Sequence, residues 1–219
     1  MNPMIKICGL STPETVRTAL ENRTDMIGFI FFAKSPRNVT VEQAATLRQL
    51  VIGNAGVVAV TVDADDALLD AIISGMKPDW LQLHGHEAPD RVAEVKARYG
   101  LPVMKAISVR EAADLDAIAP YFGIADKFLL DAKAPKGSQL PGGNGVSFDW
   151  SLLAALDPGL DYMLSGGLNA GNVGKALAIT NAPGLDISSG VESAPGIKDI
   201  GLINDFFAAV NSARPGAAQ

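Results

Sequence analysis

Short apolar runs and longer periodic segments alternate along the chain. Residues 5–8, Ile-Lys-Ile-Cys, alternate apolar and polar positions with the two-residue period of a β-strand. Residues 26–31 form a continuous apolar run, which is typical of a strand that is buried on both faces. Between them Val16, Ala19 and Leu20 recur at helical spacing. The same succession of strand and helix repeats to the end of the chain.

Eight strands are predicted in this way. They cover residues 5–8, 26–31, 56–62, 80–84, 102–107, 127–131, 162–165 and 185–188. The helices between them carry capping patterns: capping boxes at Thr40 with Gln43 and at Ser108 with Glu111, an N-cap at Asn169 and a C-terminal cap at Gly100.

The strand count predicts the architecture. Eight strands, each followed by a helix and without a break in composition, predict an α/β protein with a single (β/α)8 TIM barrel over residues 1–212. The competing fold is a doubly wound open sheet. It is disfavoured by the count of eight and because no Gly-x-Gly-x-x-Gly turn follows the first strand. Residues 213–219 are expected to form a disordered tail.

Composition excludes several classes of function. The formal net charge is −6 and no cluster of Lys and Arg occurs, so we expect no nucleic-acid partner. No apolar run is long enough to cross a bilayer and no signal-peptide pattern begins the chain, so we expect a cytoplasmic protein with no membrane partner. A single cysteine excludes an internal disulfide and a metal site built from cysteines.

Polar side chains share one face on several predicted strands. They are Lys6 with Cys8, Gln82 with His84, Lys127 with Asp131, and Asp186 with Ser188. Apolar helix stripes cover the outside of the predicted barrel, so these side chains should point inward and meet at one mouth. Ionisable groups are costly in an interior unless they are paired, so their convergence indicates a functional site. An internal network of salt bridges would explain Lys6 and Lys127 without a site.

Cys8 has two interpretations. A lone cysteine is commonly a small buried hydrophobic residue. Cys8, however, ends the first predicted strand, at the edge where barrels carry their catalytic groups, and there it could be a catalytic thiol.

Two turns indicate anion binding. Ser165-Gly166-Gly167 follows the seventh strand and Ser188-Ser189-Gly190 follows the eighth, where barrels commonly hold a phosphate. Arg37, held behind Pro36, could present its planar fork to a carboxylate, or it could be an ordinary surface arginine. The two histidines at 84 and 86 lack a third ligand nearby, so we expect no metal, and we expect His86 to face solvent.

Seven motifs at the strand ends carry a family resemblance. They are Lys6-Ile7-Cys8-Gly9, Ser35-Pro36-Arg37, Gln82-Leu83-His84-Gly85, Leu129-Leu130-Asp131, Leu164-Ser165-Gly166-Gly167-Leu168, Asp186-Ile187-Ser188-Ser189-Gly190-Val191-Glu192 and Pro195-Gly196-Ile197-Lys198-Asp199. In this order they resemble the phosphoribosylanthranilate isomerase family of tryptophan biosynthesis, over essentially the whole chain. Asn144 stands where the family usually has Thr, and Ala170 stands where its usual proline is missing.

The resemblance implies an Amadori rearrangement of N-(5-phosphoribosyl)anthranilate to 1-(2-carboxyphenylamino)-1-deoxyribulose 5-phosphate. It assigns Asp131 as the general acid, Cys8 as the general base and Arg37 as the ligand of the anthranilate carboxylate. The phosphate would be held by Gly167, Ser188, Ser189 and Gly190, and the site would be lined by His84 and Asp186. The partner is a small phosphorylated substrate, no cofactor is needed, and a monomer or a homodimer is expected.

These assignments set conditions on two pKa values. A free thiol titrates near pH ~8.5, so Cys8 must be acidified to act as a base near neutrality, and Lys6 is a candidate cause. Asp131 must be partly protonated, which requires desolvation or a nearby negative charge.

Two other functions stay open at this stage. A related sugar-phosphate isomerase of histidine biosynthesis performs the same rearrangement, but it has an aspartate at the position of Cys8. A phosphate-binding barrel that has lost catalysis is disfavoured by the presence of both Cys8 and Asp131.

Overall fold

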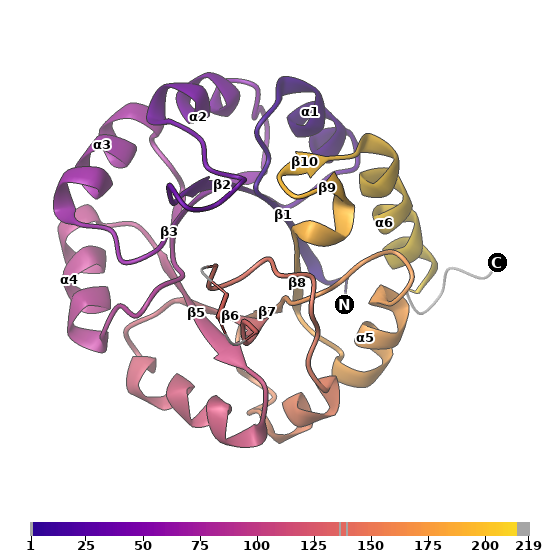
Figure 1. Cartoon of the computed structure of the whole chain (residues 1–219). Coiled ribbons are helices and arrows are strands. Elements are labelled where there is room, and N and C mark those ends of the chain that lie inside the picture. The colour runs from indigo at the N-terminus through magenta and orange to yellow at the C-terminus, as the bar shows by residue number, and fades with distance from the viewer. Residues whose placement is uncertain (1, 136, 139, 214–219) are drawn as a thin grey trace.

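Eight parallel strands close into a barrel with helices around it (Figure 1). The structure is a computed structural model that describes residues 2–135, 137–138 and 140–213. The strands are β1 (Met4–Cys8), β2 (Met26–Phe31), β3 (Gly56–Thr61), β4 (Trp80–Leu83), β5 (Val103–Val109), β6 (Lys127–Ala132), β7 (Tyr162–Leu164) and β8 (Gly184–Ile187). They pair in chain order, and β8 pairs with β1, which confirms the predicted barrel. The predicted tail lies outside the described residues, apart from Ala213.

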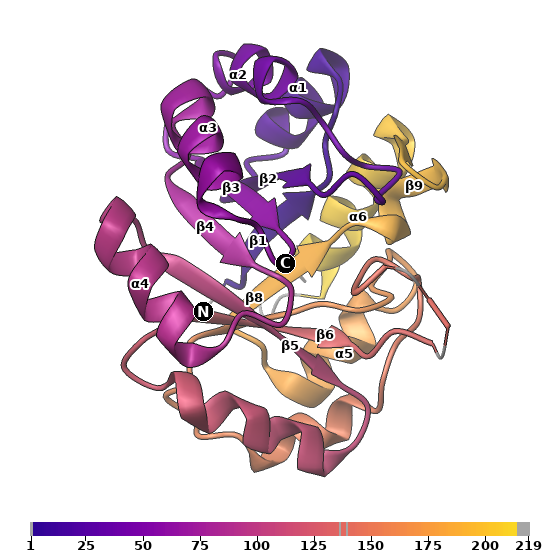
Figure 2. The same ribbon diagram turned by 60° about the vertical axis from the view of Figure 1, so that its left-hand side comes forward.

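The outer layer consists of α-helices and 3₁₀-helices that alternate with the strands (Figure 2). The α-helices are α1 (Pro13–Glu21), α2 (Val41–Arg48), α3 (Asp66–Met76), α4 (Pro89–Tyr99), α5 (Val173–Thr180) and α6 (Ile200–Ser212). The 3₁₀-helices are η1 (Ala112–Tyr121), η2 (Trp150–Ala155) and η3 (Ser189–Val191). A two-stranded hairpin of β9 (Glu192–Ala194) and β10 (Ile197–Lys198) stands between β8 and α6.

Strand alternation separates two hydrophobic cores. Ile5 and Ile7 of β1 belong to the large core between the strands and the helices. Cys8 belongs to a smaller cluster that fills the barrel. The other buried members of this inner cluster are Met26, Val58, Val60, Met104, Leu129 and Met163. The strands are therefore buried on both faces, as their continuous apolar runs predicted.

The inward polar face is confirmed for β1 and β8, with one correction on β6. Lys6 is fully buried, and its Nζ donates to Asp186 Oδ1 at 2.7 Å. Lys127, however, is not part of a convergence at the mouth. It begins β6, so its ammonium group lies at the opposite end of the strand from Asp131 and pairs with Asp161 in the segment before β7.

Two of the predicted helix caps are confirmed. Thr40 and Gln43 form the capping box of α2, with Thr40 Oγ1 accepting from the Gln43 backbone at 3.1 Å and Gln43 Oε1 accepting from the Thr40 backbone at 2.9 Å. Gly100 ends α4 in the left-handed conformation, with φ of 64°.

The other two predicted caps are wrong. The helix after β5 is the 3₁₀-helix η1, and Ser108 does not cap it. The cap is the carboxylate of Asp114, which accepts from the backbone N–H groups of Arg110 at 2.8 Å and Glu111 at 3.1 Å. Ser108 is still part of β5, which runs to Val109. Helix α5 begins after Asn172 and not after Asn169, because Asn169 is held in the preceding turn, where its Oδ1 accepts from the Gly171 backbone at 2.9 Å.

The caps give a test of stability. We expect Thr40→Ala to lower the free energy of unfolding by about 0.5–2 kcal/mol, because it leaves the backbone N–H of Gln43 without its partner. Ser108→Ala is the matched control and should change stability by less than about 0.5 kcal/mol, because Ser108 is exposed and caps no helix. Urea denaturation followed by circular dichroism measures both. Equal losses would contradict the cap assignment.

Candidate active site

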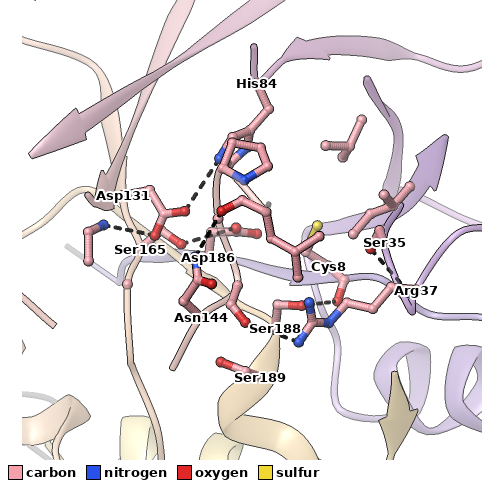
Figure 3. Close-up of a pocket in the computed structure, with 18 of the residues that line it drawn as sticks. Cys8, Ser35, Arg37, His84, Asp131, Asn144, Ser165, Asp186, Ser188 and Ser189 are labelled. Carbon is pink, nitrogen blue, oxygen red and sulfur yellow. Dashed lines mark hydrogen bonds and ion pairs between the residues drawn. The ribbon is translucent and has the colours of Figure 1, made fainter. Parts of the chain in front are cut away.

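A pocket opens at the carboxyl ends of the barrel strands and has an empty volume of about 740 Å³, counted to its open mouth. Its wall contains the predicted residues Cys8, Arg37, His84, Asp131, Gly167, Asp186, Ser188 and Ser189, most of which Figure 3 labels. Gly190 lies behind this wall, where a Cβ atom would collide with the carbonyl oxygen of Leu168.

Cys8 forms part of the pocket wall at the end of β1, and its environment corrects one expectation. Burial raises the pKa of the Cys8 thiol above its ordinary value; the positive charge of Lys6 opposes this effect without overcoming it. Lys6 thus acts in the predicted direction, but the thiol is not acidified. The main reason is burial, and the negative charge of Asp186, the partner of Lys6, adds to it by raising the pKa of Cys8 further.

The Lys6–Asp186 pair forms the floor of the pocket. Burial acts to lower the pKa of Lys6, but the charges of Asp186 and Cys8 outweigh it, so the pKa is raised above 10.5 and Lys6 stays protonated. The hydroxyl group of Ser165, directly after β7, donates a hydrogen bond to Asp186 Oδ2 at 3.4 Å. Ser188 donates to the backbone carbonyl of Cys8 at 3.1 Å. The ends of β1 and β8 are therefore linked by side chains as well as by the sheet.

Asp131 lies on the other side of the pocket, near the end of β6, and is buried (Figure 3). Its Oδ1 accepts from the Ala132 backbone at 2.9 Å, and its Oδ2 lies 3.4 Å from His84 Nε2. His84 is held in turn by Gln82, whose Nε2 lies 2.9 Å from His84 Nδ1. Gln82 therefore orients His84 beside Asp131, while His84 Nε2 makes no hydrogen bond to the residues that the structure describes.

Arg37 is buried rather than exposed, which excludes the interpretation as a surface arginine. Its Nε and Nη2 donate to the two carboxylate oxygens of Glu192 at 2.7 and 2.8 Å, and Nη2 also lies 3.2 Å from the carbonyl oxygen of Gly143. Lys198 Nζ donates to Glu192 Oε1 at 2.7 Å and to the carbonyl oxygen of Ser188 at 2.8 Å.

Sequence reasoning missed the roles of Glu192 and Lys198, although both occur in the motifs quoted for the resemblance. A usable signal was present: two opposite charges, six positions apart, flank the turn-forming pair Pro195-Gly196. This spacing predicts a hairpin that could pair them. Arg37, which also binds Glu192, is 155 positions away from it, so local spacing could not identify this pairing.

The two glycine turns form the remaining wall. Gly166 and Gly167 have φ values of 88° and 64°, and a Cβ atom on Gly167 would lie 2.8 Å from the carbonyl carbon of Val146. The Gly167 carbonyl accepts from Asn172 Nδ2 at 2.9 Å. Ser189 lines the pocket from η3. Glycine is thus required where the β7 turn meets the loop after β6.

The loop after β6 covers both Asp131 and Arg37. A Cβ atom on Gly142 would lie 2.7 Å from His84 Nε2 and would also collide with Asp131 Oδ2. Asn144, which replaces the family's usual Thr, holds this loop together: its Oδ1 accepts from Ser138 at 2.8 Å, and its Nδ2 donates to the Leu140 carbonyl at 3.2 Å.

One of the two histidines lies outside this site. His86 is 93% exposed, as predicted, and its Nδ1 lies 3.1 Å from Asp63. In the described part of the chain, no three His, Cys, Asp or Glu side chains lie close enough together to hold a metal ion. Over the same residues, none of the helices combines the length and the hydropathy that crossing a membrane requires.

Comparison with known proteins identifies the family. The family model described as N-(5'phosphoribosyl)anthranilate (PRA) isomerase matches residues 5–209. The chain belongs to the phosphoribosylanthranilate isomerase family. The N-(5'-phosphoribosyl)anthranilate isomerase of Mesorhizobium japonicum is 65% identical over 210 residues, which cover 96% of each chain. The predicted family and enzyme class are therefore confirmed: the chain is an isomerase of tryptophan biosynthesis.

Solved phosphoribosylanthranilate isomerases share the fold. One describes monomers generated from the dimeric enzyme of Thermotoga maritima; it is 29% identical, has a TM-score of 0.83, and the match covers 96% of this chain and 99% of that one. Another is a complex with reduced 1-(o-carboxyphenylamino)-1-deoxyribulose 5-phosphate, with the same identity of 29%, TM-score of 0.83 and coverage of 96% and 99%.

The Cys8 environment gives a test by titration. Because burial raises the pKa of Cys8, the midpoint of its thiolate titration should lie above that of a free thiol. Cys8 is the only cysteine, so the thiolate absorbance at ~240 nm and the rate of alkylation by iodoacetamide both report on this one group. A midpoint below that of a free thiol, in the protein without substrate, would show that Lys6 dominates over burial.

Proposed function

We propose that the chain catalyses the Amadori rearrangement of N-(5'-phosphoribosyl)anthranilate, with Asp131 as the general acid and Cys8 as the general base. The observation that supports this proposal best is the placement of the two groups. Both are buried, and they face one pocket from β6 and from β1, between the Arg37 cluster and the glycine turns.

The reaction requires two protein groups with opposite tasks. Asp131 protonates the ring oxygen of the ribose as the bond between this oxygen and C1 breaks, which gives an iminium ion. Cys8 then removes the proton from C2, and an enolamine forms. When the enolamine becomes the ketone, C1 gains a proton and the C2 hydroxyl loses one, so no atom is gained or lost overall. The steps are proton transfers only, so the chemistry requires no cofactor.

The raised pKa of Cys8 limits when this base can act. Burial disfavours the thiolate, and at neutral pH few molecules carry it. The iminium intermediate changes this balance, because its positive charge lies next to the C2 proton and stabilises a thiolate at short range. Cys8 is therefore a base that becomes effective after Asp131 has acted, which fixes the order of the two steps.

The rest of the pocket provides binding groups for the two ends of the substrate. We assign the phosphate to Gly167, Ser188 and Ser189 of the pocket wall, with Gly190 directly behind them, and the anthranilate carboxylate to Arg37. His84, 3.4 Å from Asp131, lines the site beside the proposed acid. Asp186 holds the Lys6 ammonium below the pocket.

The same proposal covers the setting of the enzyme. We place it in the cytoplasm, where reducing conditions keep a lone thiol in the form that the mechanism needs. We propose a single domain over residues 1–212 that works as a monomer or as a homodimer. The dimeric relative from Thermotoga maritima supports the second state.

Substitution of the proton-transfer pair tests the mechanism. A positioned acid or base contributes ~10²–10⁴-fold in rate, so Cys8→Ala and Asp131→Asn should each lower kcat by at least that factor. Neither change adds volume, so a product analogue should still bind. Loss of the substrate's anthranilate fluorescence measures turnover.

Cys8→Ser is the sharper variant, because a hydroxyl keeps the shape but is a far poorer base. Near-normal turnover of folded Cys8→Ser would show that the thiol only packs, and the base would then have to be sought among His84 and Asp186. A wild-type protein without turnover would instead be a barrel that binds phosphate and does not catalyse.

The phosphate position is tested by adding charge. Ser189→Asp places a carboxylate at the proposed phosphate site, so the inhibition constant for inorganic phosphate should rise by about ten-fold or more. Ser193→Asp is the matched control, because Ser193 is exposed on the β9–β10 hairpin, outside the pocket wall. Equal effects of the two variants would mean that only the overall charge matters.

A further inference from the structure

The β9–β10 hairpin places a buried carboxylate behind Arg37. Glu192 accepts from Arg37 Nε and Nη2 at 2.7 and 2.8 Å, the side-on geometry in which a carboxylate fixes the plane of a guanidinium group. It also accepts from the Gly196 backbone at 3.2 Å. The side chains of Arg37 and Glu192 are 5% and 4% exposed, so neither is free to change its conformation in solvent.

The cluster of Arg37, Glu192 and Lys198 has an excess of positive charge. It contains two cations and one carboxylate, and all three side chains are buried. Burial lowers the pKa of Lys198 to about 8, and the charge of Arg37 acts in the same direction. For Glu192 burial acts to raise the pKa, but Arg37 and Lys198 outweigh it and lower the value, so Glu192 stays ionised at neutral pH. A buried cluster of this composition lacks one negative charge.

One edge of the guanidinium group stays open toward the pocket. Nε and Nη2 are used by Glu192 and Gly143, whereas Nη1 donates to no other residue in the described part of the chain. Gly143 lies over this edge with φ of 70°, and a Cβ atom there would be 2.6 Å from Nη1. Glycine therefore leaves Nη1 uncovered where any other residue would cover it.

We propose that Glu192 is a positioning residue that acts through Arg37: it fixes the guanidinium plane with the Nη1 edge toward the pocket, so that a ligand carboxylate completes the charge of the cluster. The proposal deepens the assignment of Arg37 above and rests on it. It adds a residue that touches no substrate and yet determines whether the carboxylate of the ligand is recognised.

The test compares two ligands that differ only in the carboxylate. One is reduced 1-(o-carboxyphenylamino)-1-deoxyribulose 5-phosphate, the ligand in the solved complex of a relative, and the other is its phenylamino counterpart without the carboxylate. Isothermal titration calorimetry measures both Kd values. The Kd of the ligand without the carboxylate, divided by the Kd of the carboxylated ligand, isolates the contribution of the carboxylate. A general loss of structure would weaken both ligands and leave this ratio unchanged.

We expect Glu192→Gln to lower the ratio by about ten-fold or more, and Arg37→Ala to bring it close to one. In the double variant, Glu192→Gln should cause no further loss, because its effect passes through Arg37. Glu192→Asp keeps the charge but shortens the side chain, so it should also lower the ratio if geometry matters. A Glu192→Gln protein that is folded and keeps the wild-type ratio would overturn the proposal.

Glu87→Gln is the matched control. Glu87 is also buried, is paired with Lys105 at 2.7 Å and accepts from the backbones of Asp63 and Gly85, but it lies outside the pocket wall. Its loss should destabilise the fold and leave the ratio unchanged. If Arg37→Ala itself leaves the ratio unchanged, the proposed carboxylate site fails; if only the Glu192 variants do so, the positioning role fails.

A measurement on the wild-type protein covers variants that do not fold. Lys198 faces Glu192, Arg37 and Cys8, and with a pKa of about 8 it is half protonated at pH 8. A ligand carboxylate that completes the cluster raises the pKa of Lys198. Binding of the carboxylated ligand should therefore be accompanied by the uptake of as much as about 0.5 proton more than binding of its counterpart. Titration in buffers of different ionisation enthalpy measures the uptake. Equal uptake by the two ligands would contradict the charge argument.

Discussion

A buried lysine ammonium group needs a negative charge beside it, and the floor of this site depends on the pairing of Lys6 with Asp186. Lys6 and Asp186 are register partners on β1 and β8, so their ion pair lies at the seam where the barrel closes. Loss of either partner would leave a buried charge and cost about 3–5 kcal/mol. Cys8 and Ser188 follow on the same two strands and are hydrogen-bonded to each other. The position of the proposed base is therefore a consequence of barrel closure.

Much of this arrangement follows from alternation along the strands. A period of two determines that Lys6 and Cys8 share the inner face while Ile5 and Ile7 pack against helices, and the strand order then brings the end of β1 to the same mouth as Asp131. Local spacing also identifies the cap at Thr40, because a capping box involves residues only three positions apart.

The parts that sequence could not supply depend on three-dimensional closure. Arg37 and Glu192 meet only when the hairpin that follows β8 contacts the loop that follows β2, so no local pattern predicts their pairing. The direction of the Cys8 pKa shift was also out of reach. Its sign depends on how much burial outweighs Lys6, and the pattern of residues reveals the presence of the lysine but not the balance of the two effects. The predicted end of β5 was wrong for a simpler reason. Serine is a common helix cap, but Ser108 lies within β5, too early in the chain to cap η1.

The buried charge cluster behind Arg37 also restricts how this chain can change over evolutionary time. Arg37, Glu192 and Lys198 lie together with their side chains almost fully buried. Replacement of Glu192 alone would leave two cations facing each other, and replacement of Arg37 alone would leave Glu192 with Lys198 as a closed neutral pair. Loss of Glu192 therefore requires a second substitution at one of the two cations, so position 192 should covary with positions 37 and 198 in an alignment of relatives. A member of the family that has lost Arg37 would be expected to accept substrates without the carboxylate and to keep Glu192 paired with Lys198.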